Sequence, residues 1–306
     1  MKNSSIKPSS RIFLLSVGAM ILGVLFIDIY GIIIKFLGDA YSTNQVVLFR
    51  NLFAIIPLMT LIFYTNENLK IFKKTTKKFI ILCFIRGQCF LFMNFFYFIA
   101  INNMDFATAS TLTFSATFFI VILSIFFLND KVGIYRWSAV IIGFAGVAMI
   151  MKPTSDVFSY YSIYPVMVAL LYSIAIIILK FIPKHNSTAK IQFYSLISSI
   201  IGAVVLWAIT FDTKFIQSYK DLLMLVSIGI LGGSAGILFI YAYRLIEASK
   251  LAVFEYLAIP SSFLLGWFFF DETPIDQLFP GVLAIILAGM LIIWRDKKKK
   301  KIKKEN

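Results

Sequence analysis

The chain of 306 residues is 60% hydrophobic and 14% charged, with a mean hydropathy of +0.88. Soluble domains average about 25% charged residues, so the composition excludes a soluble globular protein and indicates a chain surrounded by lipid. The formal net charge of +14 does not indicate a nucleic-acid partner, because Lys and Arg lie between apolar segments and form no basic face on a soluble domain.

Ten apolar segments follow one another along the chain. A helix needs about 20 residues to cross a hydrocarbon core about 30 Å thick, and it satisfies its backbone hydrogen bonds internally. The first five predicted helices are 12–34, 43–64, 79–101, 107–128 and 133–151. The second five are 162–182, 191–210, 222–243, 251–270 and 278–294. We therefore predict an all-α polytopic membrane protein with ten transmembrane helices, the first of which is retained and not cleaved as a signal peptide.

Lys and Arg alternate in number between successive connections. Of the 29, 22 fall in the two tails, on one set of loops or, for Arg136, at the adjoining end of a helix; 4 fall on the other set, and Arg50, Arg86 and Lys180 lie within predicted helices. Because the side richer in Lys and Arg faces the cytoplasm, we predict a multi-pass protein of the inner (plasma) membrane with both termini cytoplasmic. The lysine-rich segment 297–304 is interpreted as a topology anchor that also attracts anionic lipid.

The chain is similar to itself at a fixed offset. A shift of 142 residues aligns Asn129 and Asp130 with Asp271 and Glu272. We predict two five-helix repeats, 1–155 with the N-terminal tail and 156–306 with the basic C-terminal tail. Because five is odd, the second repeat enters the membrane from the opposite side, and such inverted repeats are typical of secondary transporters that work by alternating access.

Short motifs in both halves form an ordered series over residues 11–295. They are Gly31, Lys35, Phe49, Arg50, Arg86-Gly87, the segment 100–107, Tyr241-Ala242, Pro260, Asp271-Glu272, Gly281 and Gly289. In this order and spacing the chain resembles EamA-type members of the drug/metabolite transporter superfamily. It departs from them with Thr117 in place of a frequent proline, Asp130 in place of the common Glu, and Thr108 where some members have Asp. The missing proline predicts a softer break in the fourth helix.

The resemblance implies a secondary active transporter of a small metabolite, with a cavity surrounded by helices one, three, four, six, eight and nine. Amino acids, S-adenosylmethionine, nucleosides, vitamins and drugs all fall within the implied substrates, and import and export both remain open. The alternative is an integral-membrane enzyme of lipid metabolism, but the lone His185 lies in a predicted loop and no catalytic or metal-binding arrangement is present. The expected partners are a small-molecule substrate and the lipid bilayer, with no cofactor or metal; protons and a homodimer remain open additions.

Four charged residues lie at least four positions from either end of a predicted transmembrane helix, where insertion costs about 2.5–3.5 kcal/mol each. Asp28 and Arg50 fall at similar heights in the outer half of the membrane, and Arg86 and Glu255 at similar heights near the cytoplasmic surface. Each pair is interpreted either as structural neutralisation or as part of the mechanism. We expect Asp28, Arg50 and Glu255 to act in coupling or gating, with Glu255 coupling transport to protons or contacting a cationic part of the substrate.

Polar side chains of the central helices are the candidate substrate-binding residues. They are Arg86, Asn94, Tyr97, Thr111, Tyr172, Tyr241, Glu255 and Tyr256. For the tyrosines, helix packing is the alternative role that stays open. Four glycines in one helix, Gly229, Gly232, Gly233 and Gly236, predict close approach to neighbouring helices.

Overall fold

The computed structural model describes ten stretches of the chain. They are residues 10–65, 71, 75–113, 115–128, 134–151, 159–210, 214–245, 258–272, 275–288 and 290–291. Within these stretches the secondary structure is helical, without a strand. The predicted all-α fold is confirmed.

The first half contains five helical spans, two of which are broken. Its helices are α1 (Ser10–Leu37), η1 (Gly38–Ala40), α2 (Thr43–Phe53), α3 (Ile55–Tyr64), α4 (Lys77–Asn103), α5 (Phe106–Thr113), α6 (Ala116–Leu128) and α7 (Ile134–Met151). The second span breaks at Ala54, with Pro57 in the first turn of α3, where its missing N–H removes no helical bond. The fourth span breaks before Ala116 without a proline, where the Ser115 hydroxyl donates 2.8 Å to the carbonyl of Leu112.

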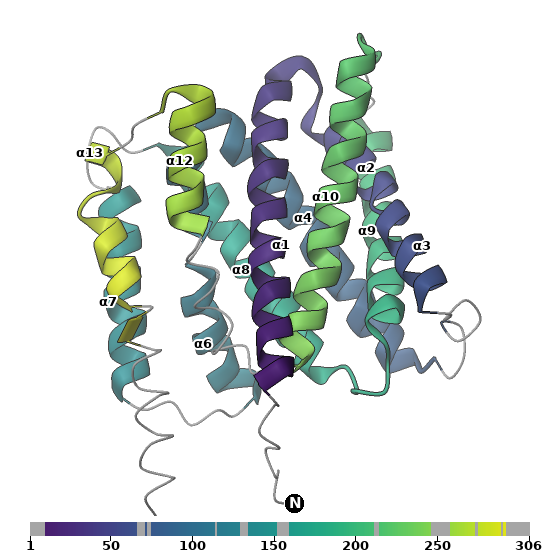
Figure 1. Cartoon of the computed structure of the whole chain (residues 1–306), viewed down its shortest axis with the longest axis horizontal. Helices are drawn as coiled ribbons and strands as arrows, with labels where there is room; N and C mark the ends of the chain where they lie inside the picture. The colour runs from purple at the N-terminus through teal and green to yellow at the C-terminus, as the bar shows by residue number, and fades with distance from the viewer. Residues whose placement is uncertain are drawn as a thin grey trace, which may run out of the picture.

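The second half contributes five further spans within the described residues. Its helices are η3 (Tyr160–Ser162), α8 (Ile163–Phe181), α9 (Thr188–Thr210), α10 (Tyr219–Leu245), α12 (Ala258–Phe270), α13 (Ile275–Leu278) and a helix over residues 281–288. Successive spans alternate in direction (Figure 1), so α8, the sixth span, runs opposite to α1, the first. The two halves are therefore inverted relative to each other.

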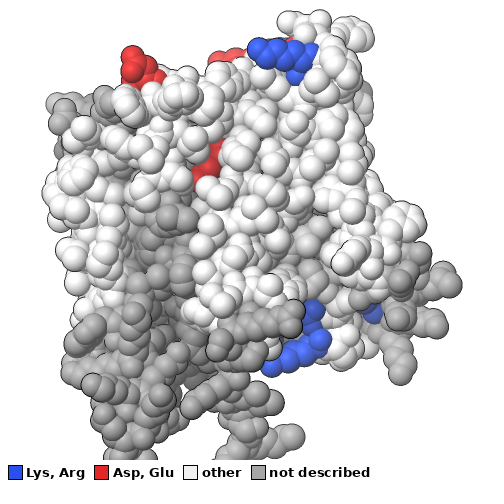
Figure 2. All heavy atoms as spheres, in the orientation of Figure 1, with Lys and Arg blue, Asp and Glu red and all other residues white. Residues whose placement is uncertain are grey.

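Several of these spans match the thickness of a bilayer. In the described part of the chain, seven helical segments are long and apolar enough to cross a membrane, and Val140–Ile150 and Ile259–Phe270 are shorter apolar helices. Large apolar side chains such as Phe63, Phe126 and Phe268 are exposed on the outside of the bundle. Figure 2 shows Lys and Arg near the ends of this face and a broad, almost uncharged band between them. This distribution is the one that a lipid environment requires.

The two halves pack against each other and do not form separate bodies. Helix α1 packs most extensively against α10, and α4 packs against α8 and α9. The close approach depends on α10 glycines: a Cβ at Gly229 would lie 2.3 Å from the Cβ of Phe53, and one at Gly233 would lie 2.9 Å from the Cα of Ala54. The predicted packing role of these glycines is confirmed.

Candidate functional site

A cavity lies between the two halves, at the centre of the bundle. It encloses about 920 Å³ of empty space, part of which is open to solvent. Its walls come from α1, α2, α4, α5 and α6 of the first half and from α8 and α10 of the second. Any molecule bound here contacts both repeats.

A hydrogen-bonded tyrosine cluster forms one wall of the cavity. The Tyr30 hydroxyl donates 2.9 Å to Oδ1 of Asn94, whose Nδ2 donates 2.6 Å to the carbonyl of Phe90. The rings of Tyr30 and Tyr97 are stacked, with centroids 5.8 Å apart and planes within 5°. Gly31 makes this wall possible, because a Cβ there would lie 2.7 Å from the Tyr97 hydroxyl. These contacts fix the polar groups in place before any ligand enters.

Asp28 and Arg50, which were predicted to lie at similar heights in the membrane, both line the cavity. They do not form an ion pair with each other: in the described part of the chain, ion-pair distance is reached between Lys35 and Glu272 alone. The Asp28 carboxylate accepts a hydrogen bond of 2.5 Å from the Ser261 hydroxyl of α12, and Arg50 Nη1 donates 3.3 Å to Oδ1 of Asn51. The cavity therefore presents a carboxylate and a guanidinium separately.

A second, smaller pocket adjoins the cavity between α2, α4, α9 and α10. It encloses about 320 Å³ of empty space and shares Arg50, Phe90 and Gly236 with the main cavity. Arg86 lies in this pocket at 1% exposure, and its guanidinium carbon lies 4.6 Å from the centroid of the Phe90 ring. The predicted partner of Arg86, Glu255, lies outside the described residues.

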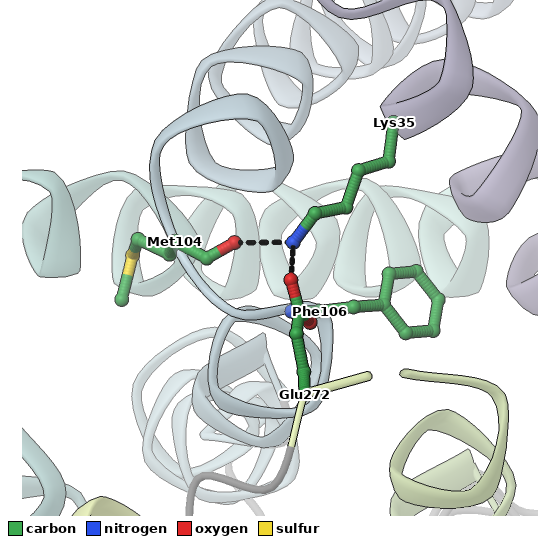
Figure 3. Close-up of polar contacts among 4 residues, drawn as sticks. All are labelled: Lys35, Met104, Phe106 and Glu272. Carbon is green, nitrogen blue, oxygen red and sulfur yellow. Dashed lines mark hydrogen bonds and ion pairs between the residues drawn. The ribbon is translucent and has the colours of Figure 1, made fainter. Parts of the chain in front are cut away.

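A polar network ties the two halves together at the end of the bundle opposite the N-terminus. Lys35 of α1 forms an ion pair with Glu272, which follows α12, and donates 2.9 Å to the carbonyl of Met104 (Figure 3). The other Glu272 oxygen accepts a hydrogen bond of 2.7 Å from the backbone N–H of Phe106 at the start of α5. A carboxylate at this position also interacts favourably with the helix dipole. We name Lys35, Met104, Phe106 and Glu272 the end network.

Of the other predicted site residues, some line the main cavity and others do not. Asn94, Tyr97 and Tyr172 line the main cavity. Thr111 is buried and donates 2.7 Å to the carbonyl of Ala107 within its own helix. Tyr241 is 39% exposed, because it follows the cavity-lining Phe239 by two residues and so projects from the opposite side of α10. Tyr256, like Glu255, lies outside the described residues.

Several polar residues of the two pockets were not predicted from the sequence. In the main cavity they are Tyr30, Ser110 and Thr113; in the smaller pocket they are Asn51, Gln192, Ser195 and Ser199. Three of them did have a sequence signal: Gln192, Ser195 and Ser199 recur at spacings of three and four, which places them on one face of their helix.

Comparisons with known proteins agree with this architecture. A family model described as the EamA-like transporter family matches residues 14–152 and 160–294. An S-adenosylmethionine uptake transporter of Rickettsia felis is 27% identical over 94% of this chain and 95% of its own length. A riboflavin transporter of Vibrio cholerae is 28% identical over 62% of this chain and 63% of its own length. A solved crystal structure at 17% identity has a TM-score of 0.67 over 92% of this chain and 96% of that one, which establishes likeness of fold.

Proposed function

We propose that this chain, which belongs to the EamA-like transporter family, is a secondary active transporter that moves a small metabolite by alternating access. Membership in this family, together with relatives named as transporters of small metabolites, supports transport over the alternative of a lipid-metabolising enzyme. The observation that carries the proposal is the central cavity, because its walls come from both inverted repeats. Rocking one repeat against the other would expose such a cavity first to one side of the membrane and then to the other.

S-adenosylmethionine is the substrate that we propose to test first. A relative named as its uptake transporter is similar over nearly the whole of both chains, whereas the riboflavin transporter is similar over less than two thirds. The cavity has groups suited to a molecule with positive and negative charges, because Asp28 and Arg50 lie on its wall without pairing with each other. Its apolar and tyrosine-rich surface suits a flat ring system.

The end network supports a role in closing one side of the transport path. Lys35 and Phe106 belong to the first repeat and Glu272 to the second, so the network joins parts that would separate when the repeats rock. The charge asymmetry of the loops supports an orientation in which this end faces outward and both termini face the cytoplasm of the inner membrane. We further propose that Glu255 couples transport to protons.

Counterflow in reconstituted vesicles tests the proposed function. Purified protein is placed in liposomes preloaded with unlabelled S-adenosylmethionine, and uptake of external labelled S-adenosylmethionine is followed. We expect transient accumulation above the level of protein-free vesicles, inhibited by excess unlabelled substrate but not by an equal concentration of a nonrelated sugar. An imposed inward proton gradient should increase uptake by the unmodified protein and not by Glu255→Gln. Absence of counterflow would reject S-adenosylmethionine, and counterflow without a gradient effect would reject proton coupling alone.

A further inference from the structure

The smaller pocket concentrates positive charge inside the membrane-embedded part of the molecule. Arg50 of α2 and Arg86 of α4 both line it, at 6% and 1% exposure. The remaining lining residues are uncharged and come from the same four helices; they include Asn51, Phe90, Gln192, Ser195, Ser199 and Gly236. Among the described residues that line this pocket there is no carboxylate.

Part of this hydrogen-bonding capacity is unused within the described residues. Nε of Arg50, Nε and Nη1 of Arg86 and Oγ of Ser195 are buried without a hydrogen-bond partner there. The side-chain oxygen of Asn51 is already occupied, because it accepts 2.8 Å from Ser199 and 3.3 Å from Arg50. Two guanidinium groups that line one pocket, with N–H donors unused within the described residues, suit the pocket to a negatively charged ligand group.

The backbone is shaped around these arginines. At Gly232, a Cβ would lie 2.9 Å from Nη2 of Arg50, so any larger residue would push the guanidinium aside. At Gly87, a Cβ would lie 2.2 Å from the carbonyl oxygen of Ser195, so the absence of a side chain lets α4 and α9 meet directly beside Arg86. Gln88 reinforces this junction by donating 2.7 Å to the carbonyl of Ser198.

We propose that the pocket formed by Arg50, Arg86 and Ser195 is a carboxylate-binding subsite that holds the acid group of the transported molecule. The pocket adjoins the main cavity through Arg50 and Phe90, so a ligand in the cavity can extend its acid group into it. Guanidinium groups bind carboxylates through paired N–H donors, and such charge-assisted bonds are about twice as strong as neutral ones. This inference rests on the proposed transport function and specifies which end of the substrate the protein recognises.

Binding to the full-length protein in detergent, in chloride-free buffer, tests the subsite. The probes are S-adenosylmethionine and its decarboxylated form, which differ in the acid group alone. We expect the unmodified protein to bind S-adenosylmethionine at least about tenfold more tightly than the decarboxylated form, from the added charge-assisted bonds. Arg86→Gln should lower this affinity ratio to about one, because it weakens the binding of S-adenosylmethionine while the decarboxylated form binds as before. Arg244→Gln, which removes an arginine that donates to the carbonyl of Lys184 at the bundle surface, is the matched control and should leave the ratio unchanged.

Further measurements distinguish a wrong subsite from a misfolded variant and from a wrong choice of substrate. Size-exclusion profiles report folding, and Arg86→Lys, which keeps the charge but loses the paired donors, should reduce the ratio partially. Equal binding of both probes by the unmodified protein, or an unchanged ratio in a folded Arg86→Gln protein, would overturn the subsite. If neither probe binds, S-adenosylmethionine is the wrong substrate, and acetate then serves as the probe. Thermal stabilisation of the unmodified protein by acetate, lost in Arg86→Gln, would support the subsite. No stabilisation by acetate would overturn it. Stabilisation by chloride but not by acetate would also overturn a carboxylate site.

Discussion

Individual side chains in this bundle show how charge is accommodated away from water. Asp28 is 3% exposed and accepts a hydrogen bond from Ser261, while Arg50 contacts Asn51 and the glycine face of α10. A membrane-embedded charge costs several kcal/mol unless its surroundings compensate it, so such residues are retained where they have a use. The two charges line one cavity without neutralising each other, which leaves both available to a ligand.

Gly232 provides a prediction at the residue scale. A Cβ there would lie 2.9 Å from the Arg50 guanidinium, whereas a Cβ at Gly18 on α1 would have no atom within 4 Å. Replacing an interior helical glycine with alanine otherwise favours the helix by about 1 kcal/mol. Gly232→Ala should therefore lower the affinity for S-adenosylmethionine about tenfold by displacing Arg50, while Gly18→Ala keeps affinity and matches or exceeds the unmodified thermal stability. Equal affinities of the two variants would show that Arg50 does not need its present position.

Whole helices are held in register by contacts between the repeats. The end network joins α1, the start of α5 and the residue pair after α12 through one carboxylate, that of Glu272. The sequence repeat aligns Glu272 with Asp130. The lysine contacts are also similar in the two repeats. Lys180 of α8 donates 3.0 Å to the carbonyl of Tyr243 in α10, and Lys35 of α1 donates to the carbonyl of Met104 at the end of α4. The first helix of each repeat thus uses a lysine to tie itself to the third.

The end network predicts a shift in the equilibrium between the two access states. Glu272→Ala removes both the ion pair with Lys35 and the hydrogen bond to the α5 backbone, which together are worth about 1.5–3 kcal/mol. If these bonds form in the state closed at this end, their loss should raise the population open at this end about tenfold or more. In a Thr113→Cys background, Glu272→Ala should then raise the rate at which the cavity cysteine reacts with an impermeant thiol reagent applied outside, by about the same factor.

Two comparison variants bear on this result. Glu272→Gln keeps an oxygen for the Phe106 N–H and should give a smaller increase, and Lys220→Ala, which removes an exposed lysine near the start of α10, should give none. A reaction rate that Glu272→Ala leaves unaltered would contradict the assignment of the end network to a closed state.

At the scale of the whole molecule, the spans and their inversion follow from sequence because they depend on local hydrophobicity and on an odd number of crossings. The break at Ala54 was not predicted, since it arises from turn geometry within an apolar run, whereas a softer break was expected in the fourth span, where the helix is interrupted at Ser115. In the site, buried charges were predicted because each is conspicuous in an apolar segment. Their partners were not: Ser261 and Glu272 reach Asp28 and Lys35 from more than 230 residues away, and such pairing depends on how helices rotate in the bundle. Helix rotation also separates Tyr172 in the cavity from Tyr241 on the outside.

The most direct test of the central claim, that the cavity between the inverted repeats is the transport path, is sided labelling of Thr113→Cys in a protein whose buried Cys83 and Cys89 are replaced by alanine. Asp105→Cys and His185→Cys, at opposite ends of the bundle, establish which side of the membrane each reagent reaches. Tyr241→Cys is the control for an exposed position on the outside of the bundle, away from the cavity. We predict that Thr113→Cys reacts with an impermeant thiol reagent from either side of the membrane and that saturating S-adenosylmethionine blocks the reaction, while Tyr241→Cys shows no substrate protection. A transport-competent Thr113→Cys protein that reacts from one side alone, or that reacts equally with and without substrate, would contradict the account.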